Sequence, residues 1–312
     1  MGTPEFAVAP LDILLANNFQ IVGVVTAPDK PSGRGMKIHA SAVKEYALKK
    51  DLKIFQPEKL KNPEFIESLK ELHADLFVVV AFRMLPKSVW EIPTCGTINL
   101  HASLLPQYRG AAPINYAIIN GEKETGVTTF FINEQIDTGD IIDSVKTKIS
   151  AEENAGDLHD RLMNIGAQLV LDTVISIRDG NLKKTKQSVI TTNEILKSAP
   201  KISKDDCRIN WNKNAEIIHN KIRGLSPFPG AFTELQVHNN KKYLLKIFKS
   251  KTEIIAHNFS VGSIFSDGIN YIKIAVKNGY ILLEELQLEG RKKMSTTEFL
   301  RGFSFDGNMK VN

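Results

Sequence analysis

Residues 74–82, ADLFVVVAF, form an apolar run rich in β-branched side chains, which is typical of a strand buried on both faces of a sheet. Three other segments have the same character, and amphipathic stretches of helical spacing lie between them. The strand-like segments are QIVGVVTA at 20–27, CGTINLHA at 95–102 and GVTTFFI at 126–132, and the helical ones are SAVKEYALKK at 41–50 and PEFIESLKELH at 63–73. This alternation predicts an α/β domain built on a doubly wound, mostly parallel sheet.

The second half of the chain follows a different pattern. A long helical segment at 155–180 is followed by a polar stretch without clear periodicity, which has the composition of an interdomain linker. After about residue 205, short strands alternate with turn signals, and this is typical of a small, OB-like β-barrel. We therefore expect a catalytic domain at 1–182, a linker at 183–204 and a C-terminal β-barrel domain at 205–312.

The start of the sequence departs from this plan. The chain opens on Gly2-Thr3-Pro4 and a helix, whereas doubly wound domains usually begin with a strand that becomes central in the sheet. We expect that Met1 is an internal residue and that a short first strand is missing from the sequence as written. Two strand edges would then be left unpaired.

Composition limits the class of protein. Hydrophobic residues are 42% of the chain and charged residues 24%, which is ordinary globular usage. The two cysteines, Cys95 and Cys207, lie far apart and lack the spacing of a zinc site, so we expect neither a disulfide framework nor a metal. No signal peptide or membrane span of ~18 apolar residues is evident. These observations predict a cytoplasmic protein without a membrane segment.

Charge is distributed unevenly along the chain. Residues 181–312 hold 22 Lys and Arg against 12 Asp and Glu, whereas residues 1–180 hold 18 against 23. A basic domain attached to an acidic one is expected when one domain performs chemistry and the other holds a polyanion. The alternative is a lysine-rich surface that is only solvated.

Polar residues occur where a parallel sheet places its active site, at the carboxyl ends of strands. Asn99 and His101 lie two apart in TINLH, so a strand would present both on one face. Asp137 follows the next strand in the loop IDTGD. Together these residues could polarise a carbonyl, move a proton and orient the imidazole. Taken singly, the histidine is more often structural and the aspartate a turn former.

These motifs carry a specific resemblance. Asn99-x-His101, SLLPQYRGAAP at 103–113 and DTGD at 137–140 look like the signature of the folate-dependent formyltransferases. Flanking blocks are similar to the branch of the family that acts on a charged tRNA. These blocks are GTPEFAV at 2–8, APDKPSGRGMK at 27–37, PKISKDDCRINW at 200–211 and IRGLSPFPGAF at 222–232.

The resemblance implies the substrates and the roles of the catalytic residues. The implied donor is 10-formyltetrahydrofolate, and the implied acceptor is the α-amino group of methionine on the initiator tRNA. Asn99 would donate a hydrogen bond to the formyl oxygen as it becomes an oxyanion. Asp137 would pair with His101 and favour its charged form. No metal is implied, and a monomer is expected.

The resemblance also implies folate-binding residues, with an alternative left open. The folate would lie beside VVAFRMLP at 79–86, under the loop that follows His101; the expected contacts are Phe82, Met84, Leu85, Ser103, Leu104, Leu105 and Pro106. Ordinary core packing is the alternative for the first three.

Charge and expected exposure give the predicted tRNA contacts. In the glycine-rich loop KPSGRGMK these are Arg34 and Lys37, of which the resemblance favours Arg34; a flexible, solvated loop is the alternative. In the C-terminal domain they are Lys241, Lys242, Lys246 and Lys249, which alternate with apolar residues along one predicted strand.

Two other functions are compatible with parts of this pattern. A formyltransferase acting on a small amine, such as an amino-sugar nucleotide, would share the central motif but would not depend on the basic domain. A non-enzymatic RNA-binding protein would use the barrel alone and would bind no folate. A nicotinamide-dependent dehydrogenase is not favoured, because no GxGxxG follows a strand.

Overall fold

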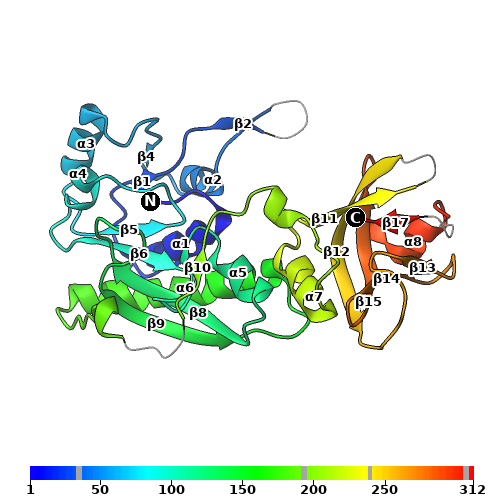
Figure 1. Ribbon diagram of the computed structural model, residues 1–312. Helices are drawn as coiled ribbons and strands as arrows, with labels where there is room; N and C mark the ends of the chain where they lie inside the picture. The colour runs from blue at the N-terminus through cyan, green and yellow to red at the C-terminus, as the bar shows by residue number, and fades with distance from the viewer. Residues whose placement is uncertain (33–36, 191–194, 238–240, 305–308) are drawn as a thin grey trace. The chain divides into compact units, whose positions relative to one another are not determined.

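The computed structural model describes residues 1–32, 37–190, 195–237, 241–304 and 309–312, and divides the chain into two compact units (Figure 1). The first unit contains Met1–Gly110, Glu124–Thr147 and His159–Ala199, and the second contains Ala111–Lys123, Lys148–Leu158 and Pro200–Asn312. The units thus interleave in sequence, whereas the expected domains at 1–182 and 205–312 are continuous. Most of the expected linker, up to Ala199, belongs to the first unit.

The first unit is built on short parallel strands, as expected for this fold class. Strand β1 (Val24–Val25) pairs in parallel with β4 (Ile54–Phe55). A second sheet has the order β5-β6-β8-β9 (Figure 1). Its strands are β5 (Phe77–Val80), β6 (Thr97–His101), β8 (Glu124–Phe131) and β9 (Ile141–Lys148).

The sheet is mixed because one strand is reversed. Strands β5 and β6 are parallel, with Val79 opposite Asn99, but β6 and β8 are antiparallel, with His101 opposite Thr128. The chain leaves β6 and enters β8 at the same end of the sheet, so the two strands must run in opposite directions. The expected strand at 126–132 is therefore present, with the opposite direction to its neighbour.

Helices cover this sheet, and some begin with residues that favour a helix start. They are α1 (Val8–Ala16), α2 (Ala42–Lys49), α3 (Pro63–Lys70), α4 (Lys87–Trp90) and α6 (Ala155–Arg178), with the 3₁₀ turn η1 (Glu5–Ala7) before α1. The Ser41 hydroxyl accepts a hydrogen bond from Lys44 N at 3.0 Å and caps α2. Pro63 occupies the first turn of α3, where a missing N–H is tolerated.

Apolar side chains of the helices pack against the sheet. Phe65 and Leu69 of α3 and Val89 of α4 pack with Phe77 and Val79 of β5 in one buried cluster. Helix α6 packs on β6 and β8, where the hydroxyls of Thr129 and Thr173 lie 2.8 Å apart. No described helix is both long and apolar enough to cross a membrane.

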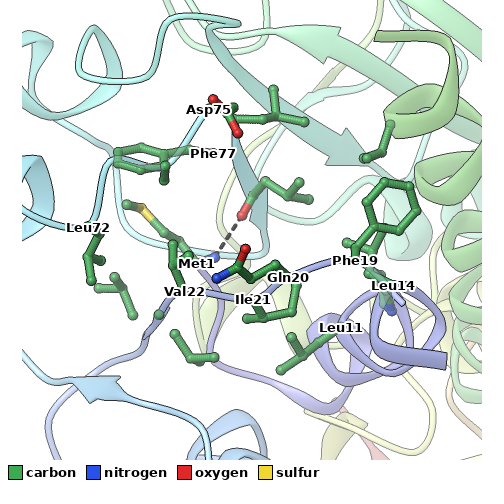
Figure 2. A pocket seen from close by; sticks show the side chains of 18 of the residues that line it. Met1, Leu11, Leu14, Phe19, Gln20, Ile21, Val22, Leu72, Asp75 and Phe77 are labelled. Atoms are coloured by element: carbon green, nitrogen blue, oxygen red, sulfur yellow. Dashed lines mark hydrogen bonds between the residues drawn. The ribbon is translucent and has the colours of Figure 1, made fainter. Parts of the chain in front are cut away.

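The first two residues join two strands that otherwise belong to separate sheets. Gly2 N donates to Val25 O of β1 at 3.0 Å, and Met1 O accepts from Val80 N of β5 at 2.9 Å. The Met1 amino group donates to Val78 O at 2.7 Å. Next to this contact lies a mainly apolar cavity of about 810 Å³, lined on two sides by β1 and β5. Figure 2 shows Met1 in this cavity, with Leu14, Phe19 and Leu72 around it.

The second unit is an antiparallel barrel in which strand order is β13-β14-β15-β12-β11-β17, with β16 paired to β15. The strands are β11 (Ala231–Gln236), β12 (Lys242–Glu253), β13 (Ile264–Ser266), β14 (Ile272–Val276), β15 (Gly279–Leu288), β16 (Met294–Ser295) and β17 (Lys310–Val311). A bridge between Ser263 and Lys310 brings the two ends of this order together, so the barrel is nearly closed. This agrees with the expected small barrel.

Three described α-helices lie within the second unit: α5 (Pro113–Ile119), α7 (Ala215–Gly224) and α8 (Thr296–Leu300). Two of them, α7 and α8, contribute buried side chains to the barrel core. Ile218 and Ile222 of α7 are buried in a cluster with Ile247 of β12 and Leu286 of β15. Trp211 donates through Nε1 to the Thr233 hydroxyl at 3.0 Å, which satisfies its one polar atom inside the core.

The buried amino group of Met1 predicts a pH dependence of folding for the chain that begins there. Burial lowers the pKa of this group from 8.0 to about 5. Between these values the unfolded chain carries the proton and the folded chain does not, so the free energy of unfolding should rise from pH 5 to pH 8. The contribution is about 1.4 kcal/mol per pKa unit.

Acetylation of the Met1 amino group removes the titration and provides the matched control. Urea unfolding at several pH values should show a flatter dependence for the acetylated chain than for the free amine. Parallel curves for the two forms would show that the amino group stays charged in the folded state.

Candidate active site

Asn99 and His101 lie on β6 with one residue between them, so both side chains project from the same face of the sheet. His101 is buried, with 7% of its surface exposed. The Asn99 Oδ1 atom is also buried, and no described residue forms a hydrogen bond with it. An unpaired buried acceptor typically costs ~1–3 kcal/mol. A buried polar atom without a protein partner is therefore a candidate for contact with a substrate or a water molecule.

The His101 ring is held by a backbone carbonyl. Its Nε2 lies 2.9 Å from Tyr108 O. A carbonyl oxygen can only accept, so Nε2 must carry a proton in this arrangement. The other ring nitrogen, Nδ1, is then the atom that gains or loses a proton during a reaction. The loop carrying Tyr108 thereby selects which nitrogen of the neutral imidazole carries the proton.

Asp137 faces that active nitrogen. Its Oδ2 lies 3.7 Å from His101 Nδ1, and the Asp137 side chain is 11% exposed. This distance is too long for a hydrogen bond but close enough for a carboxylate to stabilise an imidazolium. The same oxygen accepts a hydrogen bond from Gly110 N at 2.9 Å. Asp137 has a positive φ of 54°, an uncommon conformation for a residue other than glycine.

The loop between His101 and Gly110 is fixed by its own hydrogen bonds. Ser103 Oγ donates to Gln107 O at 2.6 Å, while Thr128 Oγ1 of β8 donates to Ser103 O and accepts from Leu105 N. The peptide bond before Pro106 is cis. Since these contacts anchor both the start and the middle of the loop, the Tyr108 carbonyl is presented to His101 by a rigid segment.

The residues expected to contact folate have different surroundings. Met84 is 68% exposed, whereas Leu85 lies in the buried cluster beneath β5 and Phe82 packs at its edge. The surroundings of Leu85 match the alternative of core packing. Ser103, Leu105 and Pro106 are buried within their loop and Leu104 is half-buried. Their contact with a folate remains a prediction.

The residues expected to contact tRNA are spread over both units. Arg34 lies outside the described residues, and Lys37 begins strand β3 (Lys37–His39), which pairs with β2 (Lys30–Ser32). In the barrel, Lys242 lies 3.0 Å from Glu234 and Lys249 lies 3.4 Å from Glu284.

The other two barrel lysines have partners of a different kind. Lys241 lies over the ring of Tyr243, and Lys246 donates to Pro229 O at 3.0 Å. A register shift between Ile247 and Lys249 interrupts the alternation of β12. Ile247 and Phe248 are both buried, and Lys249 after them is exposed.

A residue that sequence reasoning missed connects the parts of this site. Gln187, in the 3₁₀ turn η2 (Gln187–Val189), accepts hydrogen bonds from Arg109 and donates hydrogen bonds to the carbonyls of Asp137 and Gly139. It lies in the polar stretch interpreted as a linker, where no periodicity or motif distinguished it. Its role could be found only from the folded chain.

The arrangement provides an amide, an imidazole with one active nitrogen, and a carboxylate beside that nitrogen. These groups can polarise a carbonyl and accept a proton from a nucleophile. Within the described ranges, no group of three or more His, Cys, Asp or Glu side chains is placed to hold a metal ion.

Comparison with protein families gives two matches that together span most of the chain. The model described as "Formyl transferase" matches residues 1–174, and that described as "Formyl transferase, C-terminal domain" matches residues 201–304. A protein of Flavobacterium johnsoniae named methionyl-tRNA formyltransferase is 53% identical over 311 residues, covering 100% of this chain and 97% of the relative. A protein of the same name from Bacteroides fragilis is 50% identical over 311 residues, covering 100% and 96%.

Solved structures show the same fold at lower identity. An N-formyltransferase from Helicobacter canadensis, in complex with folinic acid and dTDP-3-aminofucose, aligns with a TM-score of 0.64 at 24% identity, covering 94% of this chain and 97% of that one. HypX from Aquifex aeolicus, in complex with tetrahydrofolic acid, aligns with a TM-score of 0.57 at 19% identity, covering 83% of this chain and 45% of that one.

Proposed function

Because this chain belongs to the formyl transferase family, we propose that it transfers a formyl group from 10-formyltetrahydrofolate to the α-amino group of methionine on the initiator tRNA. The reaction would prepare the charged tRNA for translation initiation, in the cytoplasm and by a monomer. Relatives about half identical over their full length are named for this activity. The observation that supports the proposal most strongly is the Asp137 carboxylate 3.7 Å from His101 Nδ1, with Asn99 two residues before His101 on the same strand.

The proposed mechanism gives a separate role to each of the three residues. The amine nitrogen attacks the formyl carbon, and the carbonyl electron pair moves onto oxygen. The Asn99 side-chain amide donates through its nitrogen to this oxyanion. His101 Nε2 is committed to Tyr108 O, so Nδ1 takes the proton released by the amine. Asp137 stabilises the resulting imidazolium across 3.7 Å.

Collapse of the intermediate completes the transfer. The oxyanion re-forms the carbonyl, the bond from the formyl carbon to N10 of the folate breaks, and the proton held by His101 passes to N10. The products are formylated methionyl-tRNA and tetrahydrofolate, and no net charge or electron is left over. His101 returns to its starting protonation state.

The decisive assay incubates the purified chain with labelled 10-formyltetrahydrofolate and methionyl-tRNA. Label should appear on the methionine of the tRNA. Free methionine and dTDP-3-aminofucose serve as alternative acceptors, the second because a solved relative contains it. Transfer to the amino sugar but not to the tRNA would support the small-amine alternative, and absence of any transfer would support a binding protein.

Substitution of Asn99 tests the oxyanion role. Asn99→Ala and Asn99→Asp should each lower kcat by about 10²- to 10³-fold, since each removes the donor. Folding should be little affected by Asn99→Ala, because the change also removes a buried oxygen that has no partner among described residues. Single-turnover kinetics and thermal unfolding are the measurements. A near-normal kcat for either variant would exclude Asn99 from the transition state.

Charge reversal in the barrel tests the proposed tRNA interaction. Lys241→Glu and Lys249→Glu, combined, should raise KM for methionyl-tRNA while leaving KM for the folate unchanged. Removing one lysine–phosphate interaction should reduce the slope of log affinity against log salt by about 1. The matched control reverses Lys49 and Lys50 at the end of α2, which are equally exposed. An equal effect of both pairs would mean that only net charge matters.

A further inference from the structure

Gln187 uses the full hydrogen-bonding capacity of its side chain in a buried position. Its Oε1 accepts from Arg109 Nε at 3.1 Å and from Arg109 Nη2 at 2.6 Å. Its Nε2 donates to Asp137 O at 3.0 Å and to Gly139 O at 2.8 Å. Gln187 is 5% exposed. An amide that makes four such bonds holds a fixed orientation, because any rotation would leave buried polar groups unpaired.

Backbone pairing fixes the position from which this side chain reaches. Thr185 and Ile141 exchange two hydrogen bonds, each 2.8 Å long, at the start of β9. Gln187 lies two residues after Thr185, and Ile141 lies two residues after Gly139. The backbone pairing therefore holds Gln187 close to the turn whose carbonyls its Nε2 binds. The turn is held at two points by the side chain and at a third by the backbone.

The turn held in this way carries the Asp137 carboxylate. The Asp137 backbone has the positive φ of 54°, a conformation that is uncommon outside glycine but that aspartate tolerates in turns. Gly139 follows closely, and a Cβ at that position would lie 1.6 Å from Phe131 O, so the turn has no room to shift toward β8. The carbonyl bonds from Gln187 hold it from the other side.

Gln187 also holds the loop whose Gly110 N–H binds that carboxylate. Asp137 Oδ2 accepts from Gly110 N, and Gly110 directly follows Arg109, whose guanidinium binds Gln187 Oε1. One side chain therefore fixes both ends of the Gly110–Asp137 hydrogen bond. When both are in place, Oδ2 lies 3.7 Å from His101 Nδ1.

We propose that Gln187 is a positioning residue for formyl transfer: it holds the turn at residues 137–139 against the loop at residues 109–110, so that the Asp137 carboxylate faces His101. Gln187 does not touch the reacting atoms. It acts on the reaction through Asp137, and the proposal rests on the function proposed above.

Two variants separate the acceptor role of Gln187 Oε1 from the donor role of Nε2. Gln187→Met removes all four hydrogen bonds at similar volume. Gln187→Glu keeps the acceptor for Arg109 but replaces the donors that hold the Asp137 and Gly139 carbonyls. The matched control is Gln168→Met on α6, where an exposed glutamine bonds only to the neighbouring Asp172 within the described structure.

Steady-state kinetics with methionyl-tRNA and 10-formyltetrahydrofolate give the first measurement. Both Gln187 variants should lower kcat by about 10- to 100-fold, as expected for a displaced catalytic group, while KM for both substrates stays within about threefold. Gln168→Met should behave like the parent. A purely structural role would lower the thermal midpoint but leave kcat per folded molecule unchanged, and that result would overturn the proposal.

Amide hydrogen exchange at Gly110, measured without substrates, gives the second. Gly110 N–H is protected by Asp137 Oδ2, so exchange should accelerate about tenfold or more in both Gln187 variants and not in the control. Unchanged exchange would overturn the proposal even if kcat fell. Failure of the parent protein to formylate methionyl-tRNA would instead overturn the proposed function, and the exchange result would still decide the position of Asp137.

Discussion

The hydrogen bond between His101 Nε2 and the carbonyl of Tyr108 is the interaction on which the proposed mechanism depends. Because a carbonyl cannot donate, this bond assigns the ring proton to Nε2 and leaves Nδ1 as the basic atom. The carboxylate of Asp137 lies on the Nδ1 side and not on the Nε2 side. In the proposed mechanism the proton of the amine therefore goes to one atom, beside the Asp137 carboxylate.

The fold brings His101, Asp137 and the Tyr108 carbonyl together from three different segments. Strand β6 supplies Asn99 and His101, and the turn between β8 and β9 supplies Asp137. The loop after β6 supplies the Tyr108 carbonyl, and its backbone pairs with a later segment, since Tyr108 N donates to Lys197 O and Arg109 pairs with Ser198. A stretch with the composition of a linker therefore belongs to the same compact unit as His101 and Asp137.

Alternation along strands made part of the site predictable from sequence. Two residues separated by one position in TINLH must share a face if the segment is a strand, and apolar runs located the strands themselves. The reversal of β8 was not predictable, because it depends on where the chain re-enters the sheet. The exposure of Lys249 depends on a register shift in β12, and a regular alternation from Lys242 and Lys246 would have pointed it inward.

Gln187 could not be found from the sequence for a related reason. Its hydrogen-bond partners are two carbonyls and one guanidinium that surround it only after folding, and backbone carbonyls leave no pattern in a sequence. The loop motif that contains Arg109 was recognisable, whereas its partner in an aperiodic polar stretch was not. Side chains that bond to the backbone are in general invisible to methods that read periodicity or spacing.

The protonation of the His101 ring in the folded protein is the most direct test of this mechanism. Nitrogen-15 NMR of the imidazole, assigned by comparison with His101→Asn, reports which ring nitrogen carries the proton of the neutral form. We expect a proton on Nε2 and a bare Nδ1 facing Asp137. A neutral ring protonated at Nδ1 would contradict the mechanism, because the Tyr108 carbonyl would then face an atom with nothing to donate.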